Sequence, residues 1–179
     1  YTFPHLTIQE FVAALAQFLT LDPGDIGKVL SEAHCKEDGR FEIFLHFAAG
    51  LSSPQAARPL EELLGPFHHQ TTCRVIGWVK EKVEGQFGNT ERESGKRILL
   101  NAFHYLFQSQ NKALAQNTVG SVQALMFFGL SLTPIDCVIL SHIIGFCNAI
   151  QHLDLQNCYI QYEGLQRLEP VLNKCHVVG

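Results

Sequence analysis

Histidine and cysteine, the side chains that most often hold transition metals, stand close together at three places in the sequence. The three places are His34-Cys35, His68-His69 with Cys73 four residues later, and Cys175-His176. A structural zinc site needs four ligands, which usually come in sequence as two close pairs such as C-x₂₋₄-C with H-x₃₋₅-H. No such set of four occurs, so we expect no metal site and interpret these histidines as surface residues beside loops.

Patterns that would indicate catalysis are missing as well. The sequence has no G-x-S-x-G turn, no cysteine paired by motif with a histidine, and no pair of carboxylates at a spacing that suggests acid–base chemistry. The net charge is −4, and the densest basic spots, Lys80 with Lys82 and Lys96-Arg97, are mixed with glutamates. Such mixing is typical of a solvated surface. We therefore expect a protein that is not an enzyme and binds no nucleic acid.

The cellular location is predicted from the lack of a membrane-spanning segment and of a secretory signal. No apolar run reaches the roughly 18 residues of a membrane span, and the first residues lack the basic start of a secretory signal. We expect a cytoplasmic protein without a membrane partner, and hence reduced thiols rather than disulfides.

The last third of the chain repeats itself with a period of 28 residues. Eight positions recur at this offset, and in seven of the eight pairs both residues are apolar: Val122/Ile150, Leu125/Leu153, Phe127/Leu155, Leu130/Cys158, Leu132/Ile160, Asp136/Gly164, Leu140/Leu168 and Ile144/Leu172. Cys147 likewise recurs as Cys175. A Leu-x-Leu run that is followed by Cys or Asn is typical of the strand and bend of a leucine-rich repeat. The pattern predicts about two repeats over residues 119–179, each with one strand and one helix.

Within these repeats, the strand positions predict a surface for a protein partner. Asp154 lies between Leu153 and Leu155, so on a strand it points to the opposite, solvent-facing side. Met126 is its equivalent one repeat earlier. Met126 and Asp154, with Gln156 beside them, are therefore candidate partner contacts, and the alternative is a merely solvated strand face. Cys158 should turn inward at the end of its strand, where its thiol can donate to a neighbouring carbonyl.

The first two-thirds of the chain has helical patterns and no alternating strand pattern. Thr7-Ile-Gln-Glu10 has the form of a capping box, and Asp22-Pro23 and Ser53-Pro54 are typical helix starts. Cys73 is predicted to lie on the apolar face of a helix over residues 70–83, followed by a long loop over 84–95 and a helix from about Arg97. We predict roughly six helices that end near residue 119, and therefore a mainly α fold in which a multi-helix domain precedes a short α/β solenoid.

The order of several segments resembles the NOD-like receptors, the cytosolic nucleotide-binding, leucine-rich-repeat proteins of innate immunity. "FPHLTIQEFVAAL" (3–15) resembles the end of their winged-helix domain, and "EDGRFEIFLHFAAGLSSP" (37–54), "PLEELLG" and "ESGKRILLNAFHYLFQSQN" resemble their helical domain 2. His46 departs from this pattern, because the family often has Arg there. The resemblance implies residues 1–20 as the winged-helix end, 21–118 as helical domain 2, and 119–179 as the first repeats, of the ribonuclease-inhibitor type.

The resemblance also implies a regulatory role without chemistry in this chain. In the family, the histidine equivalent to His5 faces the β-phosphate of ADP in an upstream nucleotide-binding domain. This sequence has no G-x-x-x-x-G-K-[ST] loop, so ADP or ATP is implied for a longer parent protein only, and no cofactor is expected here. The implied partners are the upstream domain, further repeats, and a protein ligand or a second copy in inflammasome-like signalling. The alternative is a free-standing leucine-rich-repeat scaffold that binds a protein partner.

Overall fold

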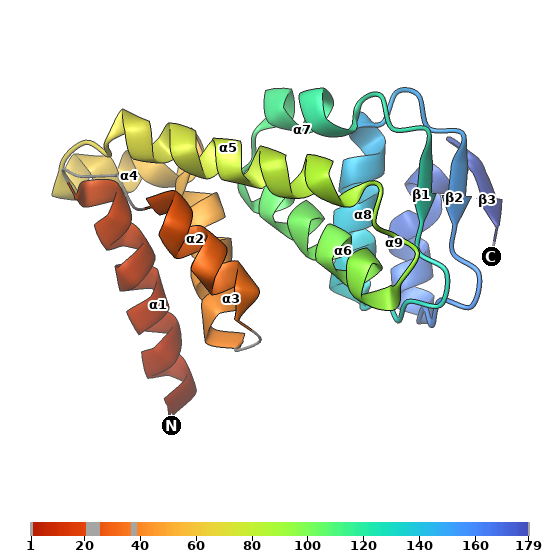
Figure 1. The fold of residues 1–179 in the computed structure, drawn as a ribbon, viewed down its shortest axis with the longest axis horizontal. Coiled ribbons are helices and arrows are strands. Elements are labelled where there is room, and N and C mark those ends of the chain that lie inside the picture. Colours follow the sequence, from red (N-terminus) through yellow and green to blue (C-terminus); the bar gives the residue numbers. More distant parts are fainter. Residues whose placement is uncertain (1, 21–25, 37–38, 179) are drawn as a thin grey trace. The chain divides into compact units, whose positions relative to one another are not determined.

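The computed structural model describes the backbone of residues 2–20, 26–36 and 39–178, and the side chains of these residues apart from 2–5 and 39–41. This described part forms nine helices and three short strands (Figure 1). The helices are α1 (Thr2–Leu19), α2 (Ile26–Cys35), α3 (Gly39–Leu51), α4 (Pro54–Leu64), α5 (His69–Gln86), α6 (Glu93–Gln108), α7 (Lys112–Val119), α8 (Pro134–Phe146) and α9 (Tyr162–Leu172). The strands are β1 (Ala124–Met126), β2 (His152–Asp154) and β3 (His176–Val178). The described part is thus mainly α, as predicted.

The chain divides into two compact units, residues 1–79 with 108–110, and residues 80–107 with 111–179. In the first unit, α1 and α2 pack against α3. Aromatic side chains join these helices and the segment before α5, with ring centroids 5.2 Å apart for Phe11 and Phe47 and 5.3 Å apart for Phe18 and Phe67. The predicted divisions at residues 20 and 118 refer to the domains of a family rather than to compact units, and they stay predictions.

Helix starts in the first unit were predicted with mixed success. α1 begins at Thr2, so the capping box at Thr7–Glu10 is wrong: both residues lie inside the helix. Pro4 is compatible with this early start because proline is tolerated in the first helical turn. The start predicted at Asp22-Pro23 falls outside the described residues. α4 begins at Pro54 as predicted, yet the buried hydroxyl of Ser53 has no hydrogen-bond partner among the described residues and does not cap it.

The second unit differs from the prediction between residues 84 and 119. The predicted loop 84–95 is shorter, because α5 continues to Gln86 and α6 begins at Glu93. Gly95 is no loop residue: it lies in the first turn of α6, where an added Cβ would collide with the carbonyl of Asn89. α7 was missed. Its cap is Asn111, whose side chain accepts a hydrogen bond from the amide of Leu114 at 3.0 Å.

The strands form one parallel sheet in the order β1-β2-β3, with α8 and α9 packed against each other along one side of it (Figure 1). β1 and β2 pair with Leu125 opposite Leu153, which is the 28-residue offset that the repeat predicts. Leu125, Phe127, Leu130 and Leu153 are at most 2% exposed. β3 was not predicted as a strand, and it pairs with β2 at an offset of 24 residues, from His152 to His176.

The unequal pair Asp136/Gly164 in the internal repeat has a structural reason at its glycine. Gly164 lies in α9 directly against α8, and a Cβ there would come within 2.8 Å of the sulfur of Cys137. Cys137 is fully buried. The second copy of the repeat therefore needs a residue without a side chain at this position.

Gly164→Ala is expected to destabilise the chain by about 1–3 kcal/mol, because the added methyl group overpacks the contact between α9 and Cys137. Gly145→Ala in α8 is the matched control, since no atom lies within 4 Å of its added Cβ. The control should be neutral or slightly stabilising. Urea unfolding followed by circular dichroism measures both changes, and equal effects of the two substitutions would contradict this account of the packing.

Candidate functional site

The carboxylate of Asp136 is a buried polar group that α6 and the start of α8 hold together. It is the third residue of α8 and forms a capping box with Thr133, accepting from the Thr133 amide at 2.9 Å while the Thr133 hydroxyl accepts from the Asp136 amide at 3.2 Å. From α6, His104 Nε2 lies 2.8 Å from Oδ1 and Arg97 lies 3.4 Å from Oδ2. Asp136 is only 4% exposed, so this one side chain joins two helices and a cap.

The charge of Asp136 is maintained although the group is buried. Burial alone would raise the pKa of the carboxyl, but the hydrogen bonds with His104 and with the Thr133 backbone and side chain outweigh it. The result is a pKa lowered from 3.8 to about 2. The site is therefore a structural junction, in which the charged carboxylate of Asp136 connects α6 to the start of α8.

Two neighbouring basic residues of α6 extend this junction to the turn after β1. Lys96 donates to the carbonyl of Phe128 at 2.8 Å, and Arg97 donates to the carbonyl of Ser131 at 2.7 Å. The Lys96 ammonium also lies 5.4 Å from the centre of the Phe128 ring. Lys96 is only 8% exposed. The interpretation of Lys96-Arg97 as a solvated surface is therefore wrong for Lys96, which is buried and bonded to a backbone carbonyl that no sequence pattern reveals.

The candidate partner residues lie on the sheet face opposite the buried leucines. Met126 is 38% exposed and pairs with the half-buried Asp154 on the next strand. Part of Asp154 is used locally, because its Oδ1 accepts from the Gln156 amide at 2.9 Å. The Gln156 carbonyl accepts from Gly129 at 2.9 Å. Met126 and Asp154 are thus neighbours across the two strands, and Asp154 is linked to the exposed Gln156 in the turn after β2.

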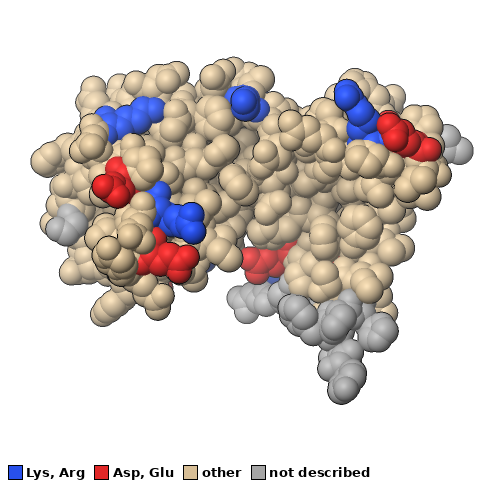
Figure 2. Space-filling view, turned by 180° about the vertical axis from the view of Figure 1, so that it is seen from behind, with Lys and Arg blue, Asp and Glu red and all other residues tan. Residues whose placement is uncertain are grey.

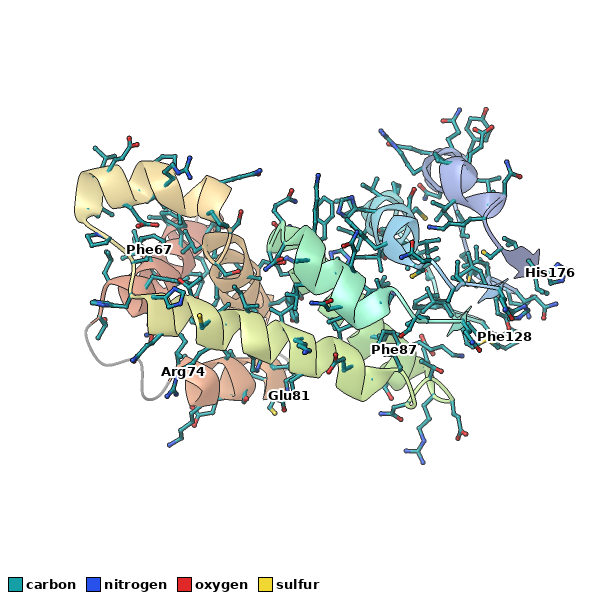
Figure 3. The ribbon with its side chains drawn as sticks, turned by 90° about the horizontal axis from the view of Figure 1, so that it is seen from above. Phe67, Arg74, Glu81, Phe87, Phe128 and His176 are labelled. Atoms are coloured by element: carbon teal, nitrogen blue, oxygen red, sulfur yellow. The ribbon has the colours of Figure 1, made fainter. Side chains whose placement is uncertain are left out.

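Sequence reasoning missed three further residues on or beside this sheet face. The rings of His152 and His176 stack at 5.9 Å across neighbouring strands. Phe128, 46% exposed, follows β1, and Figure 3 labels Phe128 and His176 beside the strands. The signal for His152 was available in the sequence, since it stands two residues before Asp154 and must share its face. His176 could not be found because β3 was not recognised as a strand.

The cysteines follow the predictions in part. Cys158 donates to the Phe127 carbonyl at 3.0 Å and is half-buried, which confirms the predicted bond to a carbonyl after the strand. Cys147 is buried, and its burial raises the pKa of the thiol to about 11. Cys73 is exposed on α5, so its predicted place on the apolar face is wrong: the apolar face is made by Val75, Trp78, Val79 and Val83.

The remaining predictions concern His5, metal ligands, membrane helices and surface charge. His5 falls in α1, and its side chain lies outside the described residues. Across the described residues, no group of three or more His, Cys, Asp or Glu is placed to hold a metal ion, and no helix is long and apolar enough to cross a membrane. The face shown in Figure 2 carries scattered charged side chains of both signs among mostly uncharged residues.

Comparison with known proteins identifies relatives for most of the chain. Residues 5–117 match the family described as the NLRC4 helical domain HD2. The NLR family member X1 of Rattus norvegicus is 27% identical over 144 residues, which cover 80% of this chain and 14% of that protein. The "NACHT, LRR and PYD domains-containing protein 5" of Homo sapiens is 33% identical over 135 residues, covering 69% of this chain and 11% of that protein. This chain therefore spans a small part of the length of these relatives.

Replacing Asp136 is expected to make stability depend differently on acid. Because the folded-state pKa is lowered to about 2, ionised Asp136 contributes about 2 kcal/mol above pH 4, and this contribution disappears as the pH falls from about 4 to about 2. The free energy of unfolding of the chain should therefore exceed that of Asp136→Asn at pH 5, and the difference should shrink towards pH 2. Urea unfolding at several pH values measures it; a difference independent of pH would contradict the buried-carboxylate account.

Proposed function

Because the chain belongs to the family of the NLRC4 helical domain HD2, we propose that it is a regulatory and protein-interaction segment of a cytosolic innate immune receptor of the NLR type. Its relatives include an NLR family member and a NACHT, LRR and PYD domains-containing protein, and the matched segments cover 14% or less of their length. In this proposal the chain performs no catalysis and acts through contacts with neighbouring domains.

Residues 119–179 are, in this proposal, the first leucine-rich repeats of that receptor. Two observations support the assignment. The strands β1 and β2 pair in parallel at the 28-residue offset of the sequence repeat, and each is followed by a helix on the same side of the sheet. The isolated bridge between Leu132 and Ile160 repeats the same offset outside the strands. The face with Met126, Asp154 and Gln156 is the partner surface of these repeats.

The junction at Asp136 is the observation that carries the regulatory role. The family match ends at residue 117, so α6 belongs to the helical domain and Asp136 lies beyond it. Lys96, Arg97 and His104 of α6 hold residues 128–136 through one carboxylate and two backbone carbonyls. These contacts couple α6 to the first repeat. In this proposal, the coupling is how the helical domain braces the repeats against an upstream nucleotide-binding module in the resting state.

Nucleotide binding belongs to that upstream module in this proposal. The two described glycines with positive φ, Gly65 and Gly129, stand singly at a helix end and in a turn, and they make no glycine-rich loop that could wrap a phosphate chain. The proposal therefore places ADP or ATP in the upstream module and not in this chain. His5 remains the proposed contact to ADP in the longer receptor.

Loosening the junction is expected to raise basal self-association of the receptor. Asp136→Asn removes the charge that His104 and Arg97 share, while Arg92→Gln, an exposed residue before α6, is the matched control. In the 179-residue chain, amide hydrogen exchange should quicken in β1 and α8 for Asp136→Asn only. In the longer receptor without a trigger, light scattering should detect more oligomer for the same variant.

Two outcomes separate the structure from the role. Unchanged exchange would show that Asp136 does not hold the two helices together. Faster exchange with unchanged self-association would show that Asp136 stabilises the junction but would contradict the bracing function. That result would favour a repeat scaffold that binds a partner independently of nucleotide switching.

Calorimetric titration of Mg-ADP into the 179-residue chain is expected to show no saturable binding, with the same result for His5→Ala. The reason is the absence of a phosphate-binding loop from the sequence. Saturable binding that is lost in His5→Ala would contradict the assignment of the nucleotide to an upstream module.

A further inference from the structure

His69 and Cys73 form a converging pair of metal-ligand atoms on the surface of α5. His69 is the first residue of the helix and Cys73 stands four residues later, so both side chains project from the same face. The Cys73 sulfur lies 3.3 Å from His69 Nε2, and both residues are exposed. No four-ligand motif surrounds this pair in the sequence, but the short distance between the two atoms depends on the fold and cannot be seen in a motif.

That distance is close to what a tetrahedral metal requires. Zinc binds imidazole nitrogen at about 2.0 Å and thiolate sulfur at about 2.3 Å, so two such ligands at a tetrahedral angle lie about 3.5 Å apart. The observed 3.3 Å therefore needs an adjustment of only a few tenths of an ångström. Exposed side chains on one helical turn can make this adjustment by a small change of side-chain torsion, without moving the backbone.

The ligand types determine which metal ions suit the pair. Thiolate and imidazole together favour Zn²⁺ and its spectroscopic substitute Co²⁺ over the hard ions Mg²⁺ and Ca²⁺, which prefer oxygen. Binding replaces the S–H bond of Cys73 by a metal–sulfur bond and releases one proton to solvent. Because the described residues offer no third ligand at this place, the remaining coordination positions are left for water or for side chains of a partner.

We propose that His69 and Cys73 form a two-residue chelate for Zn²⁺ or a similar thiophilic divalent ion on the surface of α5. The site is open rather than closed. Its ion therefore exchanges with solvent and can be shared with a second protein that supplies the missing ligands, such as a second copy with the same pair. This site is independent of the function proposed above, since neither residue takes part in the junction at Asp136.

Cobalt titration of the reduced 179-residue chain tests the chelate directly. A thiolate-to-Co²⁺ charge-transfer band in the near ultraviolet should appear with wild type and be displaced by Zn²⁺. The band should be lost in Cys73→Ser, and the Kd should rise at least about tenfold in His69→Asn, which keeps a polar side chain but removes the ring nitrogen. Cys35→Ser is the matched control, because Cys35 is also an exposed helical cysteine, and it should leave the band unchanged.

Protection from alkylation gives a second readout within one molecule. At a Zn²⁺ concentration ten times the Kd, iodoacetamide should modify Cys73 about tenfold more slowly, since only the free thiol reacts, while the rate at Cys35 should not change. A stoichiometry of one metal per chain or per two chains supports the proposal. Equal rates at Cys73 with and without millimolar Zn²⁺, or a cobalt band that survives in Cys73→Ser, would overturn it. Circular dichroism verifies that each variant is folded.

Discussion

A buried ionised carboxylate is stable only if nearby hydrogen-bond donors and positive charges replace its lost hydration. In the second unit, the carboxylate of Asp136 has this requirement. Its 4% exposure would make the ionised form costly, and the hydrogen bonds with His104 and the Thr133 cap offset that cost, with Arg97 3.4 Å away on the same carboxylate. These partners come from α6 and from the residues that begin α8. The position of one helix relative to the other therefore depends on a single charge rather than only on apolar packing, which tolerates sliding and repacking more readily.

The internal repeat shows how the same position can meet two opposite demands. In the first copy the neighbour is α6, which offers a histidine and an arginine, and Asp136 pairs with them. In the second copy the neighbour is α8, which places the sulfur of Cys137 so close that only glycine fits at Gly164. The one non-apolar pair in an otherwise apolar repeat thus reports a change of neighbour. This pair of positions distinguishes α8, which contacts α6, from α9, which contacts α8.

Periodic apolar residues were predictable because their spacing is imposed locally by the helix or the strand. The offset from Leu125 to Leu153 and the bond of Cys158 to a carbonyl followed from such spacing, and the start of α4 at Pro54 followed from the local Ser-Pro signal. The start of α1 and the strand β3 did not. Thr7 matches a capping pattern that also occurs inside helices, and β3 departs from the 28-residue period by four residues, so the repeat that revealed β1 and β2 placed no strand there.

The candidate sites show a deeper limit of sequence reasoning, because their decisive partners have no sequence signature. Lys96 and Arg97 resemble any charged pair on a solvated helix, yet Lys96 is buried with its ammonium on the backbone carbonyl of Phe128, and Arg97 donates to the carbonyl of Ser131. Every residue has a carbonyl, so only the fold determines which one a lysine meets. The same holds for His69 and Cys73: their four-residue spacing was visible, but a spacing becomes a chelate only when the rotamers bring the two atoms to 3.3 Å. Side-chain convergence, rather than residue identity, separates a ligand pair from two surface residues.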